Sequence, residues 1–117
     1  MFPTAKDFVQ PVSVTIKAGA ALSDAVDIRR YPNAGYVLAG AWTAASLGFK
    51  VSLDGVNFYP LRNAAGALVE MASVGASEGR SLPSDVAPFQ YVKLWSETAG
   101  SDVNQAADRV FTVGTKG

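Results

Sequence analysis

The sequence contains no cysteine and no histidine among its 117 residues. The lack of cysteine excludes disulfides, thiolate zinc sites and cysteine nucleophiles. The lack of histidine removes the commonest metal ligand and the usual general base near neutral pH, and with it a serine triad of the ordinary kind. Phosphate-binding loops of the G-x-x-x-x-G-K or G-x-G-x-x-G type are also absent. We therefore expect a protein that is not an enzyme, with no catalytic residues, no metal and no cofactor.

Charge of either sign is scarce. Lys and Arg number 10, Asp and Glu number 10, and charged residues make up 17% of the chain, against ~25% in typical soluble domains. A chain without net positive charge is a poor candidate for neutralising phosphates, so no nucleic-acid partner is expected. Neutrality and low charge also reduce solubility. Two interpretations stay open: copies of the chain or a partner cover part of the surface, or the protein simply carries few charges.

Long hydrophobic runs are absent as well. The longest stretch of low charge, residues 34–49, is interrupted by glycine, serine and threonine and falls short of the ~20 apolar residues of a membrane helix. The N-terminus lacks the basic and then apolar pattern of a signal peptide. We expect a soluble protein that has no membrane partner and is synthesised in a host cytoplasm. The length fits one domain at residues 12–117, preceded by an arm at residues 1–11.

The clearest local pattern lies at residues 47–59. Leu47, Phe49, Val51 and Leu53 alternate with smaller or polar residues, a period of two that places them on one face of a strand. Asp54-Gly55 then fits the two central positions of a type I′ turn. The pattern predicts a β-hairpin whose returning strand places Phe58 on the same inward face as Phe49.

The rest of the chain repeats this pattern and predicts an all-β protein. Strands are expected at residues 12–18, 25–30, 36–42, 47–53, 56–62, 67–73, 91–97 and 109–115. Pro60 favours an edge position for its strand, and the apolar third segment favours a central one. Residues 75–80 are expected to form a polar loop, and residues 85–89 a loop or one helical turn. About eight strands at this spacing are typical of a single antiparallel β-sandwich or barrel.

The aromatic residues supply the candidate binding residues. If Val92 and Leu94 face the core, Tyr91 and Trp95 lie on the outer face of their strand. Such a pair is typical of a sugar-stacking platform or a protein interface, and it also fits rings that merely cover a second sheet or a loop. In the arm, Phe2, Phe8 and Val9 leave two interpretations open, disorder or docking onto a neighbouring subunit.

Acidic residues offer one weaker signal. Asp85, Asp102 and Asp108 lie in or beside predicted loops, where carboxylates from several loops can bind Ca²⁺. No segment resembles a known calcium loop. Solvated loop acids are therefore the expected state, with a structural Ca²⁺ as the alternative.

Several segments together resemble a family of small structural proteins of tailed bacteriophages and prophages. The most specific are residues 41–46 (AWTAAS) and 104–107 (NQAA). The resemblance extends over residues 12–115 and includes the segments 14–28, 47–59 and 91–96. It implies a virion structural protein with a jelly-roll-like β-sandwich, of the capsid decoration (cement) or head spike and fibre base type. No catalytic residues or cofactors follow from it.

The resemblance also implies partners. A decoration protein would contact the major capsid protein and other copies of itself, as a trimer, on the exterior of the capsid. The arm lies outside the residues that carry the resemblance, and our own hypothesis is that it clamps a neighbouring subunit through Phe2, Phe8 and Val9. Two alternatives remain: a carbohydrate-binding module that reads host glycans through Tyr59, Tyr91 or Trp95, and a neck or tail component of the virion.

Overall fold

The computed structural model describes residues 10–31 and 33–115, and this part of the chain folds into ten strands and two 3₁₀ turns without an α-helix. The strands are β1 (Val12–Ile16), β2 (Leu22–Asp27), β3 (Gly35–Ala39), β4 (Ser46–Ser52), β5 (Tyr59–Pro60), β6 (Glu70–Met71), β7 (Glu78–Ser81), β8 (Tyr91–Thr98), β9 (Ser101–Asp102) and β10 (Arg109–Gly114). The 3₁₀ turns are η2 (Ile28–Arg30) and η3 (Ser84–Val86).

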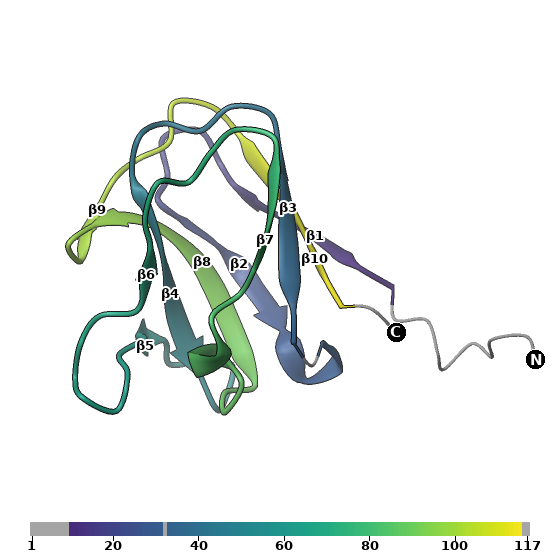
Figure 1. Ribbon diagram of the computed structural model, residues 1–117, viewed down its shortest axis with the longest axis vertical. Coiled ribbons are helices and arrows are strands. Elements are labelled where there is room, and N and C mark those ends of the chain that lie inside the picture. The colour runs from purple at the N-terminus through teal and green to yellow at the C-terminus, as the bar shows by residue number, and fades with distance from the viewer. Residues whose placement is uncertain (1–9, 32, 116–117) are drawn as a thin grey trace, which may run out of the picture.

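Two antiparallel sheets pack face to face, which confirms the predicted β-sandwich (Figure 1). The first sheet has the order β1-β10-β3-β7 and the second the order β2-β8-β4-β5, with β6 on β4 and β9 on β8. The first strand pairs with the last, the second with β8, the third with β7 and the fourth with β5. A two-stranded antiparallel ribbon rolled up in this way, and closed by the β10–β3 and β4–β8 pairs, is a jelly roll.

The core lies between the sheets and follows from the period-two patterns. Leu47, Phe49 and Val51 on β4 face Phe111 and Leu38 of the first sheet, and all five are less than 5% exposed. The apolar third segment is central, as predicted, because β3 lies between β10 and β7. At one end of the core, the Trp42 ring meets Phe111 edge-on, with 5.7 Å between the ring centroids.

The predicted type I′ hairpin is wrong. Gly55 has a positive φ of +79°, but Asp54 does not. The β4–β5 pair that closes the loop is Val51 with Tyr59, so the connection is longer than two residues. The Asp54 carboxylate instead accepts hydrogen bonds from the backbone N–H groups of Val56 and Asn57, at 2.8 and 2.9 Å. The side chain thus organises a longer loop, as aspartate does in Asx turns.

The longer loop moves two side chains out of the predicted core. Leu53 is 60% exposed, because β4 ends at Ser52. Phe58 is half-buried on the outer face of the second sheet, where the Lys93 ammonium lies 4.6 Å from the centre of its ring. The prediction that Phe58 faces inward is therefore wrong as well.

Other strand boundaries also differ from the prediction. β2 begins at Leu22 and ends in the turn η2, where a strand was expected to continue to residue 30. β5 and β6 contain two residues each, while full strands were expected at residues 56–62 and 67–73. β5 is an edge strand, as Pro60 predicted. The expected polar loop at residues 75–80 contains most of β7. This strand was not predicted because its sequence, EGRS, consists of small and charged residues without an apolar alternation.

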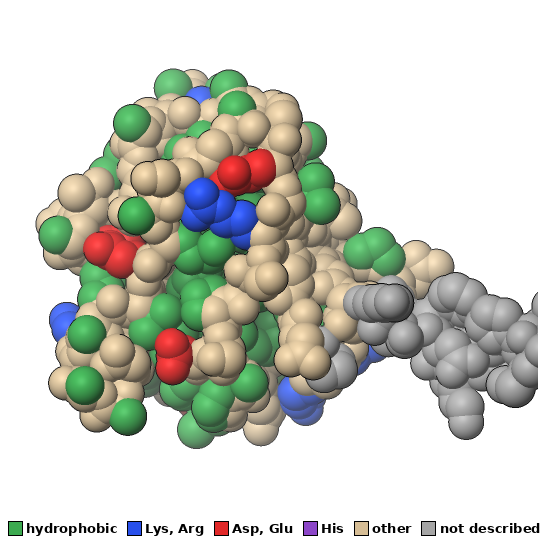
Figure 2. All heavy atoms as spheres, viewed as in Figure 1, with side chains coloured by type: hydrophobic (Ala, Val, Ile, Leu, Met, Phe, Trp, Pro, Cys, Tyr) green, Lys and Arg blue, Asp and Glu red, His purple; other side chains and the backbone are tan. Residues whose placement is uncertain are grey.

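One side of the sandwich is closed by a loop that is held by a single arginine. Figure 2 looks onto this side, and hydrophobic side chains are visible between β7 and the strands of the other sheet. The Arg80 guanidinium donates hydrogen bonds to the backbone carbonyls of Ala72 and Ser73, at 2.8 and 2.7 Å, and pairs with Glu78 at 2.9 Å. Glu78 in turn accepts from the backbone N–H of Gly75. The charged pair thus anchors residues 72–75 over the edge of the core.

Candidate binding surfaces

The described residues contain no group of three or more Asp, Glu, Cys or His side chains placed to hold a metal ion. Two of the loop acids considered for Ca²⁺ have structural roles. The Asp102 carboxylate accepts from the Trp95 indole N–H at 2.7 Å, and that of Asp108 accepts from the backbone N–H of Ala18 at 2.8 Å. Within the same residues, no helix is long and apolar enough to cross a membrane.

One sequence match to a catalytic motif has a structural explanation. Residues 75–79 read G-A-S-E-G and match the G-x-S-x-G motif of serine hydrolases. The expectation that the chain is not an enzyme did not consider this match. A nucleophile elbow places its serine between a strand and a helix, with a histidine as base. Ser77 has a positive φ of +52°, but it lies in the turn before β7, and the chain has no histidine. The match therefore marks a turn.

The outer face of the sheet β1-β10-β3-β7 is a surface without charged residues. Its outward positions form three rows across the sheet, in which the paired residues come from neighbouring strands. These rows are Ser13, Thr112, Val37 and Gly79; Thr15, Val110 and Ala39; and Gly114, Gly35 and Ser81. None of the ten residues is charged, although Val37 is 56% exposed and Val110 41% exposed. Charge is depleted in the same way at the centre of protein interfaces.

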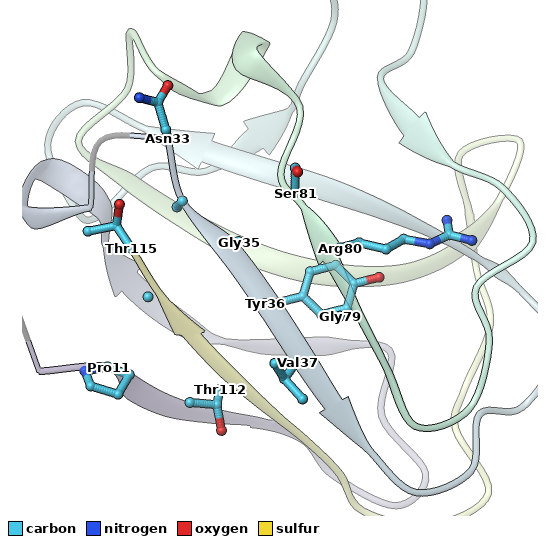
Figure 3. A pocket seen from close by; sticks show the side chains of 12 residues that line it. Pro11, Asn33, Gly35, Tyr36, Val37, Gly79, Arg80, Ser81, Thr112 and Thr115 are labelled. Atoms are coloured by element: carbon cyan, nitrogen blue, oxygen red, sulfur yellow. The ribbon is translucent and has the colours of Figure 1, made fainter. Parts of the chain in front are cut away.

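A groove of about 530 Å³ crosses one end of this face. Figure 3 shows it from close by: Pro11 lies at the start of β1, Thr112 and Val37 follow on the next two strands, and Gly79 and Ser81 lie on β7. Glycine residues keep the floor low, since Gly35, Gly79 and Gly114 have no side chains. The groove therefore runs across β10, β3 and β7, and Pro11, which directly precedes β1, forms one end of its rim.

The outer face of the second sheet has the opposite character. Lys50 and Lys93 are paired across β4 and β8, and the Lys50 ammonium lies 4.8 Å from the centre of the Trp95 ring. Trp95 is on the outer face, as its alternation with Val92 predicted, but it is only 3% exposed. Its indole is covered by Lys50 and tied to Asp102. Trp95 is therefore closed to a stacking sugar ring, which corrects the expectation that it is accessible.

Tyr91 is half-buried at the other end of β8 and is also engaged within the chain. The Arg29 guanidinium lies 5.4 Å from the centre of its ring and donates to its hydroxyl at 3.3 Å. Arg29 also makes a two-bond ion pair with Asp27, at 2.9 and 2.6 Å. These hydrogen bonds hold the pKa of Asp27 at about 2, below its ordinary value of 3.8. Asp27 therefore stays ionised and fixes Arg29 against Tyr91.

A buried carboxyl group lies beside Trp95. Glu97 is fully buried, and its Oε1 accepts from the backbone N–H of Gly100 at 2.8 Å. Its Oε2 has no donor among the described residues, while the Glu70 carboxyl on β6 lies beside it. Burial raises the pKa of Glu97 from 4.5 to about 7, and the neighbouring Glu70 carboxyl adds to this rise. Glu97 therefore keeps its proton to a higher pH than an exposed glutamate does.

The loop between β4 and β5 forms a second apolar surface. Leu53, Val56 and Tyr59 are 60%, 78% and 65% exposed, and they are held on a loop that Asp54 braces. A cavity of about 430 Å³ adjoins the loop and is lined on its other side by Phe89 and further residues of the β4–β5 region. Sequence patterns missed Leu53 because it continues the inward alternation of β4.

The structure separates the predicted binding residues. Tyr91 and Trp95 share one strand, and Tyr59 lies on the edge strand β5 of the same sheet. Of these three described side chains, Tyr59 alone presents a largely exposed ring. Phe2, Phe8 and Val9 lie outside the described residues. The uncharged sheet face escaped the prediction, because its ten residues come from four strands that are far apart in the sequence.

Comparisons of the chain with protein-family models, with curated proteins and with solved structures gave no significant match.

Proposed function

We propose that the protein is a structural component of a bacteriophage virion, a decoration protein that binds the exterior of the capsid. The observation that carries this proposal is the uncharged outer face of the sheet β1-β10-β3-β7, with Val37 and Val110 exposed on it. The jelly-roll fold occurs in viral capsid and lectin domains, which is support by analogy alone. In this proposal the major capsid protein and other copies of the chain are the partners, and the copies form a trimer.

The size of the face favours repeated weak contacts. Four strands about 4.8 Å apart, each with about five residues rising about 3.3 Å, give a face of roughly 300 Å². A stable complex of two proteins buries about 800 Å² per partner. One copy would therefore bind weakly through this face alone. Many copies on a regular capsid lattice, linked to one another by the arm at residues 1–11, gain strength through multivalency.

The number of copies per particle tests the proposal. We would purify virions from the phage or prophage that encodes the chain and measure its ratio to the major capsid protein by quantitative mass spectrometry. Hundreds of copies, together with a lower melting temperature of capsids that lack the protein, are the expected result. A dozen copies or fewer would assign it to a head spike or fibre base, the neck or the tail. Absence from the particle would refute a virion role.

A glycan-binding module on the virion is the second candidate, and one observation favours it. Tyr59 presents a ring that is 65% exposed beside the cavity of about 430 Å³, which Asp54, Asn57 and Arg62 also line. An exposed ring flanked by such polar groups is suited to a sugar. In this candidate Tyr59 carries the stacking, since Trp95 is covered.

Titration with host polysaccharide, followed by NMR, tests this candidate. Shifts centred on residues 53–62 that disappear in Tyr59→Ala and persist in Tyr59→Phe would support glycan binding. The absence of shifts at any host polysaccharide concentration would remove it.

A further inference from the structure

We propose that the groove on the outer face of the sheet β1-β10-β3-β7 receives residues 1–9 of a second copy of this chain. The proposal extends the proposed function by naming the surface that the arm contacts, and it rests on that function only for its setting on the capsid. Self-association through this groove can be measured without a capsid.

The position of the arm's attachment point is the first argument. Pro11 forms one end of the groove's rim, and its ring packs close to Gly114 on β10. Nine residues precede the described part of the chain, with the sequence MFPTAKDFV. At about 3.3 Å per residue they span at most roughly 30 Å, while the three strands that line the groove span about 14 Å. The segment is therefore long enough to cross the groove of an adjacent copy.

The attachment also favours a second copy over the groove of the same chain. A residue that precedes proline is restricted to extended backbone, and proline fixes its own φ. The carbonyl of Gln10 is held as well, because it accepts a hydrogen bond of 2.7 Å from the Tyr31 hydroxyl. A sharp turn across the chain's own sheet would have to begin at this restricted position. These restrictions oppose a turn at residues 10 and 11 that would lead back across the chain's own sheet.

Chemistry is the third argument. The sheet face of the groove presents backbone, valine, threonine and serine. Arg80 also lines the groove, but its guanidinium is bound to the carbonyls of Ala72 and Ser73 in the neighbouring loop. The arm carries Phe2, Phe8 and Val9, and its Lys6 and Asp7 balance each other. Glycine floors in β-sheets are favourable places for aromatic rings, which cover the exposed backbone. Phe2 and Phe8 therefore match the glycine floor in shape and polarity.

The area also agrees with a second copy as the occupant. Two phenylalanines bury about 300–500 Å², and the sheet face adds roughly 300 Å². If each copy both donates its arm and accepts one, each contributes about 600–800 Å², close to the ~800 Å² per partner of a stable complex. The area buried per copy reaches that size only when the arm contributes to the interface.

Sedimentation velocity of the full chain from about 1 μM to about 1 mM tests the proposal, because weak association shows in this range. Three variants are compared with the wild type: Val37→Lys on the face, the double change Phe2→Ser and Phe8→Ser in the arm, and Ala25→Lys as the control. Ala25 is exposed on β2 of the other sheet. Val37 is 56% exposed, so its replacement is compatible with folding, which circular dichroism verifies.

We expect the wild type to associate in a concentration-dependent way. In the face variant and in the arm variant the dissociation constant is expected to rise at least about tenfold, which corresponds to a loss of about 1.4 kcal/mol of binding free energy. The control variant is expected to associate like the wild type. A monomeric wild type, association that survives Val37→Lys, or equal weakening by Ala25→Lys would each overturn the proposal. A wild type that is monomeric in solution but present at hundreds of copies on purified virions would overturn this inference and leave the decoration function intact.

Discussion

Replacement of Glu97 by glutamine is expected to remove most of the pH dependence of folding stability between pH 4.5 and pH 7. In the folded protein, burial and the neighbouring Glu70 raise the pKa of Glu97 from 4.5 to about 7. The folded state therefore binds a proton that the unfolded chain releases at lower pH. Its stabilising effect is complete below pH 4.5 and is lost as the pH rises to about 7.

The size of the effect follows from the shift. A difference of about 2.5 pH units, from 4.5 to about 7, corresponds to about 3 kcal/mol at 1.36 kcal/mol per unit. Glutamine keeps the carbonyl oxygen that accepts from Gly100 and presents an amide N–H₂ to Glu70, without an ionisable group. Glu97→Gln is thus expected to equal the wild type near pH 4.5 and to exceed its stability by up to about 3 kcal/mol near pH 8.

Other ionisable groups lie around Glu97, and one of them, Glu70, provides a second variant for this test. Glu70 faces it from β6, Asp102 is its cross-strand neighbour on β9, and Lys50 lies over the adjacent Trp95 ring. Burial is the larger cause of the raised pKa, and Glu70 the smaller. Glu70→Gln is therefore expected to reduce the pH dependence without abolishing it.

Urea unfolding followed by tryptophan fluorescence at several pH values measures these stabilities. Trp95 lies beside Glu97 in the second sheet and reports on its surroundings. Asp85→Asn is the control, because Asp85 is exposed on the turn η3. If the wild type and Glu97→Gln lose stability in parallel between pH 4.5 and 7, the assignment of this titration to Glu97 is refuted.

Three further predictions concern packing, a buried polar network and an ion pair. Gly48→Ala would place a Cβ 2.9 Å from Cγ of Glu97 and 3.1 Å from the Trp95 ring, and we expect urea unfolding to show a cost of about 1–3 kcal/mol. Gly79→Ala, with its nearest contact at 3.6 Å, should stay within about 0.5 kcal/mol. Gln105→Leu removes bonds to the Thr43 backbone and the Ser96 hydroxyl and should cost about 3 kcal/mol, whereas Asn104→Ala, at an exposed site, should be nearly neutral. Arg29→Gln should raise the pKa of Asp27 from about 2 toward 3.8, which an NMR titration measures. In the wild type, ionised Asp27 stabilises the fold above pH 3.8, and this stabilisation is lost as the pH falls to about 2. The variant should lose most of it.

Sequence patterns predicted the long strands and missed the short ones for a physical reason. β4 and β8 have buried neighbours on one face and polar neighbours on the other, so their alternation is visible in the sequence. β5 and β6 pair over only two residues each, because the loops beside them are held by side chains such as Asp54 and Asn63. Those side-chain bonds depend on local geometry, which alternation does not encode.

The accessibility of the predicted binding residues depended on tertiary neighbours. The strand pattern placed Trp95 on the correct face, but its cover comes from Lys50 on β4 and its anchor from Asp102 on β9. Tyr91 is likewise engaged by Arg29, more than sixty positions earlier in the chain. Tyr59 is exposed because it lies on a two-residue edge strand. The alternation of apolar and polar residues predicts the face of the sheet on which a side chain lies. It does not predict which other side chains cover that side chain.

The uncharged sheet face is the feature that folding alone does not explain. Antiparallel sheets with one solvated face ordinarily carry polar residues there, and a lysine or glutamate at an outward position costs the fold little. The second sheet follows that rule, with Lys50, Lys93 and Asp27 on its outer face. On the first sheet, Val37 and Val110 remain exposed in a chain whose neutrality already lowers its solubility. Exposed valines of this kind stabilise the protein only when a partner or another copy buries them, which is why the face, rather than the tyrosines or Trp95, carries the functional proposal.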